Sequence, residues 1–146
     1  AQNIFYSNVF GLEFEIEKKI QFNNENLIDV KLSYTQLKTS STQNQLSKYL
    51  SNHPNKIFSI NSNLNGKNFQ ISLLSNYIER EKEIYEMINA EVPKSYFLNN
   101  LKINYFINDK VSINCKINNL TNTKYQDILG SSLPMRWPSI GIMYLN

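Results

Sequence analysis

Apolar and polar residues alternate along most of the chain. In the first such stretch Leu12, Phe14 and Ile16 alternate with three glutamates, and six further stretches repeat the two-residue period. Successive side chains of a β-strand point to opposite faces, so this alternation indicates strands with one apolar face. The predicted strands are 5–20, 26–36, 56–64, 68–78, 98–108, 110–120 and 138–146.

The expected strands and their connections are typical of a membrane barrel. Most of the strands exceed the roughly 5 to 6 residues usual in soluble sheets and suit the about 9–11 residues of a tilted, membrane-crossing strand. Short Asn-rich turns alternate with long polar links. Outer-membrane barrels join their strands in this way, through short periplasmic turns and long extracellular loops. The long links, which are the candidate ligand-binding loops, are 37–55, 79–97 and 121–137.

The number of strands predicts an incomplete barrel. Seven crossings place the C-terminus in the periplasm and the N-terminus outside, whereas bacterial barrels have an even number of strands. An open sheet would also leave two unpaired edges in lipid. The fold class is therefore all-β, an antiparallel transmembrane β-barrel segment of about seven strands. Residues 1–146 are expected to be the C-terminal portion of a larger barrel, with the plug domain and N-terminal strands absent.

Composition excludes several classes of function. The net charge of +3 comes from cations scattered among acids, which argues against a nucleic-acid partner. No run of roughly 20 apolar residues is present, so a membrane-spanning helix is excluded. The single Cys115 cannot form a disulfide within the chain, and the single His53, at a loop edge, disfavours a zinc site.

Three glutamates on the first strand are the main candidates for chemistry. Glu13, Glu15 and Glu17 are expected to point the same way, roughly 6.5–7 Å apart, into a wet barrel interior. No base or nucleophile accompanies them, and no phosphate-binding or hydrolase motif is present. We therefore expect no enzyme, no catalytic residue, no cofactor and no metal. Cys115 alternates with Ile113 and is expected to face lipid as a small apolar residue.

Aromatic residues are expected near strand ends, where interfacial girdles form in membrane barrels. The residues interpreted in this way are Tyr34, Tyr77, Tyr96, Tyr105, Tyr125, Trp137 and Tyr144. A base-stacking platform for single-stranded nucleic acid is the alternative, but it requires a basic groove. The mixed-charge run around Arg80 and Lys82 is interpreted as a solvated loop face, and contact with a ligand or a lipopolysaccharide phosphate is its alternative. The middle link, over 79–93, also has the pattern of a short surface helix.

The C-terminal region carries a motif. The penultimate strand runs into Asn119-Leu120-Thr121-Asn122-Thr123-Lys124-Tyr125, followed by Gly130, Pro134-Met135-Arg136-Trp137 and a last strand. This order resembles the end of TonB-dependent outer-membrane receptors, where an Asn-Leu-x-Asn-x-x-Tyr signature precedes a Pro-Gly-Arg loop. The segments 8–15 and 53–56 also look like strands of that family, and the Asn-rich composition is similar to receptors of Bacteroidetes-type bacteria. Met135 departs from the expected Gly, and Asn146 ends the sequence where the family has an aromatic residue.

The resemblance implies an importer. Such receptors enclose a plug domain in a barrel of about 22 strands in the bacterial outer membrane, with a periplasmic C-terminus. They take up siderophore-iron, haem, vitamin B12 or oligosaccharides. The implied partners are outer-membrane lipid, the remaining strands, the plug, the TonB energy complex acting through the N-terminal part, and a surface lipoprotein.

Three other interpretations stay open from the sequence. The first is a small complete outer-membrane barrel of eight strands with a structural or adhesive role. The second is a soluble β-sandwich binding module, whose apolar alternates would meet in a core. An outer-membrane protease or lipase is the third, and the missing catalytic constellation disfavours it. Neither the substrate nor individual ligand-binding residues follow from the sequence.

Overall fold

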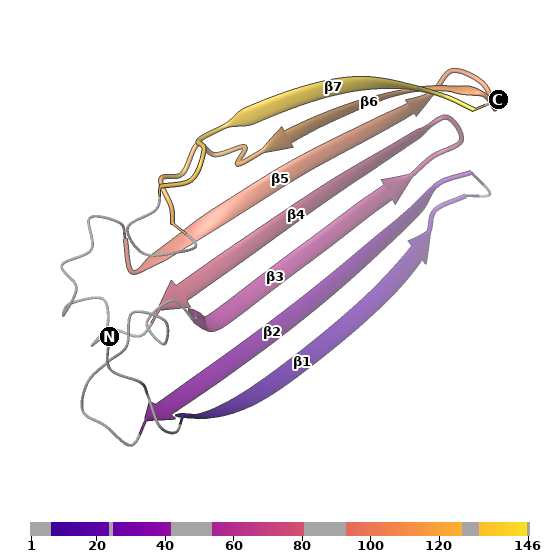
Figure 1. Ribbon diagram of the computed structural model, residues 1–146. Helices are drawn as coiled ribbons and strands as arrows, with labels where there is room; N and C mark the ends of the chain where they lie inside the picture. Colours follow the sequence, from indigo (N-terminus) through magenta and orange to yellow (C-terminus); the bar gives the residue numbers. More distant parts are fainter. Residues whose placement is uncertain (1–6, 24, 42–53, 81–92, 127–131, 146) are drawn as a thin grey trace.

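Seven β-strands form one antiparallel sheet in which each strand pairs with its neighbours in the chain (Figure 1). The computed structural model describes residues 7–23, 25–41, 54–80, 93–126 and 132–145. The strands are β1 (Ser7–Gln21), β2 (Leu27–Ser41), β3 (Pro54–Asn65), β4 (Phe69–Arg80), β5 (Ser95–Phe106), β6 (Val111–Asn118) and β7 (Trp137–Tyr144). The all-β, antiparallel part of the sequence prediction is thus confirmed, with a strand in each of the seven predicted places.

The strand ends differ from the prediction on the side of the long links. β2 continues five residues beyond 36, and β5 begins at Ser95 instead of 98. In the extension of β2 the alternation is inverted, because Leu37 now lies on the face that was polar and Lys38 on the face that was apolar. The alternation of apolar and polar residues therefore ends near residue 36, although the backbone of β2 stays paired with β1 as far as Ser41. The prediction of a helix over 79–93 was wrong for Glu79 and Arg80, because these residues end β4. Most of the remaining predicted helix lies outside the described residues.

The three short turns hold the register. The side-chain oxygen of Asn23 accepts hydrogen bonds from the backbone N–H groups of Glu25 and Asn26, at 3.1 and 2.7 Å. Asn108 repeats this arrangement, since its Oδ1 accepts from the N–H groups of Lys110 and Val111, both at 2.9 Å. Such Asx turns replace the glycine-rich turns that the chain lacks. Each predicted Asn-rich turn therefore joins two strands directly.

The register separates side chains into a mainly apolar and a mainly polar face across all seven strands. One face, the apolar face, contains the alternates expected to be apolar; the other, the polar face, contains glutamates, lysines, serines and asparagines. The polar exceptions on the apolar face include Lys18, Ser62, Ser75 and Asn99. Among the apolar alternates are Ile16, Leu32, Ile60, Leu73, Leu101, Cys115 and Ile140. The predicted placement of Cys115 on the apolar face is confirmed by its pairing with Ile103 and Ile140.

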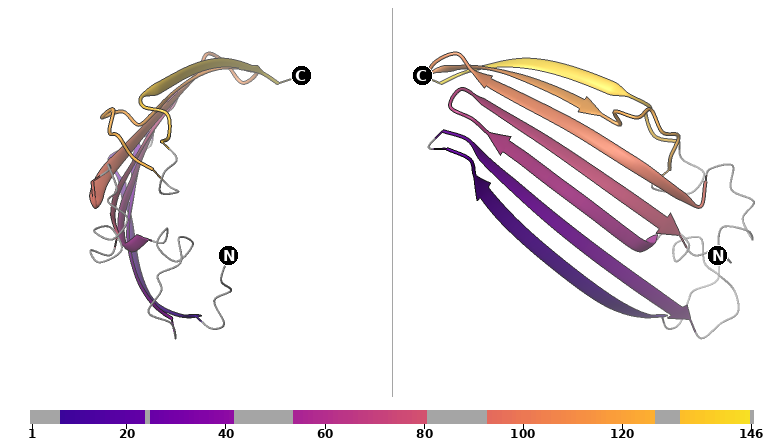
Figure 2. Two further views of the ribbon diagram at one scale, coloured as in Figure 1. Left: turned by 60° about the vertical axis from the view of Figure 1, so that its left-hand side comes forward. Right: turned by 180° about the vertical axis from the view of Figure 1, so that it is seen from behind.

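The sheet is a single layer. It is curved across its strands, and β1 and β7 form its two edges (Figure 2). Apolar side chains on the apolar face remain uncovered, with Phe10 76%, Ile140 79% and Ile142 77% exposed. Within the described residues the buried side chains are only Tyr96, Arg80 and Asn119. The described chain therefore has no hydrophobic core of its own.

We expect Asn108→Ala to weaken the turn between β5 and β6. The substitution removes an acceptor for two backbone N–H groups, and the expected loss of unfolding free energy is about 1 kcal/mol. Asn108→Asp keeps the acceptor oxygen and should behave almost like the wild type. Denaturant unfolding and amide hydrogen exchange at Val111 measure both variants. Equal stability of the Ala and Asp variants would show that the Asx turn does not hold the register.

Candidate functional site

Five aromatic side chains form a row across the apolar face. Phe14, Tyr34, Phe58, Tyr77 and Phe97 lie directly opposite one another on β1 to β5. The rings of Tyr77 and Phe97 are 4.9 Å apart between centroids and tilted by 48°. Contacts of this geometry stabilise a sheet beyond the burial of area. We call these five residues the aromatic row.

The tyrosine hydroxyls of the aromatic row point towards the long links. Tyr34 donates a hydrogen bond to Oε1 of Gln36 at 3.1 Å, and Tyr77 donates to Oε2 of Glu79 at 3.2 Å. Gln36, Lys56 and Glu79 form the next row of the same face, so the face changes from apolar to polar at this point. The aromatic row is therefore a boundary of the apolar surface on β2 to β5.

The apolar surface crosses the strands obliquely. At the long-link end its limit moves in two steps: it lies at Phe10 in β1, at the aromatic row in β2 to β5, and at Pro138 in β7, which is in the register row of Lys18. Phe10 and Lys18 are eight residues apart, so this limit moves by eight residues over six strand-to-strand steps. At the turn end the limit moves in the same direction, from Ile20 in β1 to Tyr144 in β7, by four residues. We call this oblique surface the apolar band.

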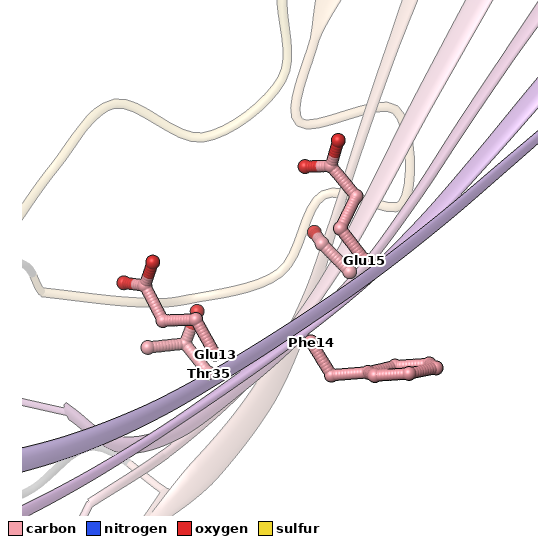
Figure 3. Close-up of a pocket in the computed structure, with 5 residues that line it drawn as sticks. Glu13, Phe14, Glu15 and Thr35 are labelled. Carbon is pink, nitrogen blue, oxygen red and sulfur yellow. The ribbon is translucent and has the colours of Figure 1, made fainter.

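The predicted glutamates share the polar face. Glu13 and Glu15 line a shallow hollow of about 260 Å³ with Ser33 and Thr35. Figure 3 shows both carboxylates on one side of the sheet and the ring of Phe14, which also borders the hollow, on the other. The expected common orientation of the carboxylates is confirmed.

Lysines on the same two strands pair with these carboxylates. Lys31 lies 2.8 Å from Glu15, and Lys19 lies 2.9 Å from Glu17. The charged groups nearest to Glu15 and Glu17 are thus cations, which balance their negative charge. Ion pairs this exposed contribute little to stability, about 0–1 kcal/mol each.

The net charge of the polar face differs between the two sides of the sheet, because four carboxylates outnumber Lys19 and Lys31 on β1 and β2. Glu13, Glu15, Glu17 and Asp29 lie on β1 and β2, whereas β5 and β6 present Lys102 directly opposite Lys116. Like charges opposite each other in an antiparallel pair are unfavourable unless another group balances them. The strands between these two sides present mainly asparagine, glutamine and serine, as the register of β3 and β4 gives them.

The Asn119–Tyr125 segment folds back onto the sheet. Asn119 is 2% exposed and left-handed at φ 51°, a conformation that asparagine tolerates better than most residues. Its side chain spans the turn, since Oδ1 accepts from the N–H of Thr123 and Nδ2 donates to the carbonyl of Thr123, both at 2.8 Å. Asn100 of β5 accepts a hydrogen bond from the backbone N–H of Asn119 at 3.0 Å. The motif thus fastens the chain after β6 to β5.

A second contact extends this fastening to β4. The ring of Tyr125 lies 5.6 Å from that of Tyr96, and the Arg80 guanidinium lies 5.3 Å from the Tyr96 ring centroid. Nη2 of Arg80 donates to the Tyr96 hydroxyl and to the backbone carbonyl of Gln126. The interpretation of Arg80 as a solvated loop residue was therefore wrong, because the side chain is 3% exposed and lies under this segment.

The aromatics that were expected to form a girdle do not all lie on one face. Tyr34 and Tyr77 belong to the aromatic row, and Tyr105 and Tyr144 lie on the apolar face near the turn end. Tyr96 and Trp137 occupy the other parity of β5 and β7, and Tyr125 packs on Tyr96. The nearness of an aromatic residue to a strand end does not specify the face on which it lies. Its separation from a residue of known face does, since Tyr96 and Trp137 are each one residue from Phe97 and Pro138 on the apolar face. His53 and Lys82 lie outside the described residues.

The described part of the chain contains no group of three or more His, Cys, Asp or Glu side chains that could hold a metal ion. It contains no helix with the length and apolar character needed to cross a membrane. Fold and site define an all-β protein built on one open meander sheet with an apolar and a polar face. Comparison of the chain with models of protein families, with curated proteins and with solved structures gave no match.

We expect Asn119→Ala to be the most damaging substitution in the fastened segment. It removes two side-chain hydrogen bonds and places alanine at positive φ, so the expected loss of stability is about 2–4 kcal/mol. Asn122, also left-handed at φ 58°, is exposed, and Asn122→Ala should cost about half as much. Trp137, paired with Asn118, reports the unfolding transition by its fluorescence. The assignment fails if Asn122→Ala is the more damaging change.

Proposed function

We propose that the chain is the C-terminal part of a TonB-dependent receptor barrel in a bacterial outer membrane. In this proposal the apolar band faces lipid and the polar face lines the interior of a barrel of about 22 strands around a plug. The whole receptor imports a scarce nutrient, such as siderophore-iron, haem, vitamin B12 or an oligosaccharide. The chain supplies wall and loops, with the three turns in the periplasm.

The oblique course of the apolar band is the observation that carries the proposal. Strands about 4.8 Å apart with a rise of about 3.3 Å, tilted by about 35–45°, cross a flat slab with a shift of about 1–1.5 residues per strand. The limits of the band shift by eight and four residues over six steps. This average of about one residue per strand supports a slab-shaped apolar environment around tilted strands.

The height of the apolar band supports the same environment. On β4 it runs from Phe69 to Tyr77 and on β5 from Phe97 to Tyr105, nine residues in each case. A tilted strand needs about 9–11 residues to cross the hydrocarbon. Tyrosines whose rings face the apolar side and whose hydroxyls reach polar groups fit the interfacial level of a bilayer.

The open single layer argues against the alternative folds. A β-sandwich requires a second sheet over the apolar face, and the described residues supply none. A barrel closed by this chain alone requires β1 and β7 to meet around one added strand, whereas they are the separate edges of the curved sheet (Figure 2). Unpaired edges are very costly in lipid, so the proposal adds further strands to both edges.

The import role itself rests on the resemblance of the Asn119–Tyr125 segment. That segment makes the contacts that fix the chain after β6, so the motif has a structural reason to be specific. The intact mass of the native polypeptide extracted from outer membranes tests the role. A mass several times 17.1 kDa is expected; a mass near 17.1 kDa without a co-purifying second fragment would overturn it.

Charge tolerance tests the assignment of the two faces. Ile113 lies in the apolar band and Asn114 on the polar face of the same strand. Ile113→Lys places a cation within the apolar band, where the cost rises from near zero at the interfaces to about 2–4 kcal/mol at the midplane, so the amount of assembled barrel should fall. Asn114→Lys should assemble almost normally. Protease protection and heat modifiability in membranes measure both, and equal behaviour of the two variants would refute the assignment.

A further inference from the structure

Two lysines contact one carboxylate directly beyond the aromatic row, and a third lysine lies on the same face. Lys56 of β3 lies 3.7 Å and Lys94 lies 3.4 Å from the same oxygen of Glu79, Oε1. Lys38 of β2 is on the same face, one row further towards the long links. We call these four residues the lysine rim.

The lysine rim has more positive than negative charge. Oε1 of Glu79 is shared by two ammonium groups, and Oε2 already accepts the hydroxyl of Tyr77. Within the described residues no ion pair involves Lys38. Among the described residues of the rim one carboxylate thus accompanies three cations, so an additional anion would balance it.

The ion pairs of the rim are too weak to hold its lysines in place. Their separations of 3.4 and 3.7 Å are longer than the about 2.7–2.9 Å of a charge-assisted hydrogen bond. Exposed pairs contribute about 0–1 kcal/mol. The ammonium groups of Lys56 and Lys94 are thus free to turn towards a stronger acceptor without a large loss of stability.

The position of the rim selects the kind of acceptor. A lysine next to an apolar surface lays its methylene stem along that surface and keeps its ammonium in the polar zone. At the edge of the apolar band this zone is the headgroup layer, where basic residues attract anionic lipid by about 1 kcal/mol each. A phosphate oxygen there would meet the ammonium groups of Lys56 and Lys94 at once.

We propose that the lysine rim binds the phosphate of an anionic lipid headgroup. The site rests on the proposed membrane location and goes beyond it, because it predicts which lipid collects around this part of the barrel. The lipid phosphate lies between Lys56 and Lys94, with Lys38 beside it, and its acyl chains lie along the aromatic row.

The chain offers a matched control on its other face. Lys102 and Lys116 are also two lysines on adjacent strands, directly opposite each other, but they lie on the polar face. In the proposed barrel they face the interior and cannot reach membrane lipid. Replacing both lysines of either pair by glutamine changes the net charge of the protein equally.

The experiment uses the full-length protein in vesicles of phosphatidylcholine with a minor fraction of phosphatidylglycerol. After mild detergent extraction, native mass spectrometry counts both lipids retained per protein. The wild type is expected to retain phosphatidylglycerol preferentially. In the Lys56→Gln/Lys94→Gln variant the preference for phosphatidylglycerol should fall about fivefold for each lysine removed. The Lys102→Gln/Lys116→Gln variant should keep the preference of the wild type.

Glu79→Gln gives a change of the opposite sign. The amide still accepts the Tyr77 hydroxyl but no longer competes for the lysines, so the preference should rise about fivefold. Loss of the preference in the Lys102/Lys116 variant, or no loss in the Lys56/Lys94 variant, overturns the proposal. So does displacement of the lipid by inorganic phosphate at low concentration, which would indicate a site for the free ion. Failure of the wild type to enter vesicles would instead refute the membrane location, and the lipid site with it.

Discussion

The two faces of the sheet depend on one constraint, the parity of the register. Side chains alternate with a period of two, so a slip of one residue between any two strands would exchange the faces of every later strand. The Asx turns of Asn23 and Asn108, and the turn at Gly66 whose N–H donates to the carbonyl of Phe69 at 2.8 Å, prevent such a slip. The aromatic row, the apolar band and the difference in net charge across the polar face all follow from this parity.

The sequence was sufficient to predict the strands and the two faces of each strand. It was not sufficient to predict which residues of neighbouring strands lie opposite one another. Alternation within a strand reveals its own two faces, so Glu13 and Cys115 were placed correctly. The aromatic row joins residues from five strands, and its alignment depends on the lengths of the connections between them. Periodicity within one strand does not contain that information.

Arg80 was misplaced for a related reason. A charged residue within an acidic and basic run is usually solvated. Here β4 includes Arg80, and the alternation of side chains along β4 places the Arg80 side chain on the polar face. There its guanidinium donates hydrogen bonds to the Tyr96 hydroxyl and to the carbonyl of Gln126. The useful sequence signal was the count of residues from Tyr77, since three residues separate the two and odd separations change the face.

The Asn119–Tyr125 segment and the uncovered apolar face are linked. Asn119 and Tyr125 fasten the chain after β6 to β5, through Asn100 and Tyr96, both of which belong to the polar parity of that strand. The chain that leaves β6 is thereby held on the polar side of the sheet at its long-link end. Two N–H-bearing atoms of Arg80, Nε and Nη1, lack an acceptor, although an unpaired buried donor costs about 1–3 kcal/mol or more. This fastening keeps the described chain after β6 away from the apolar band. Such an arrangement is required of a surface that faces lipid. It would be a disadvantage for an apolar surface that has to be covered in water.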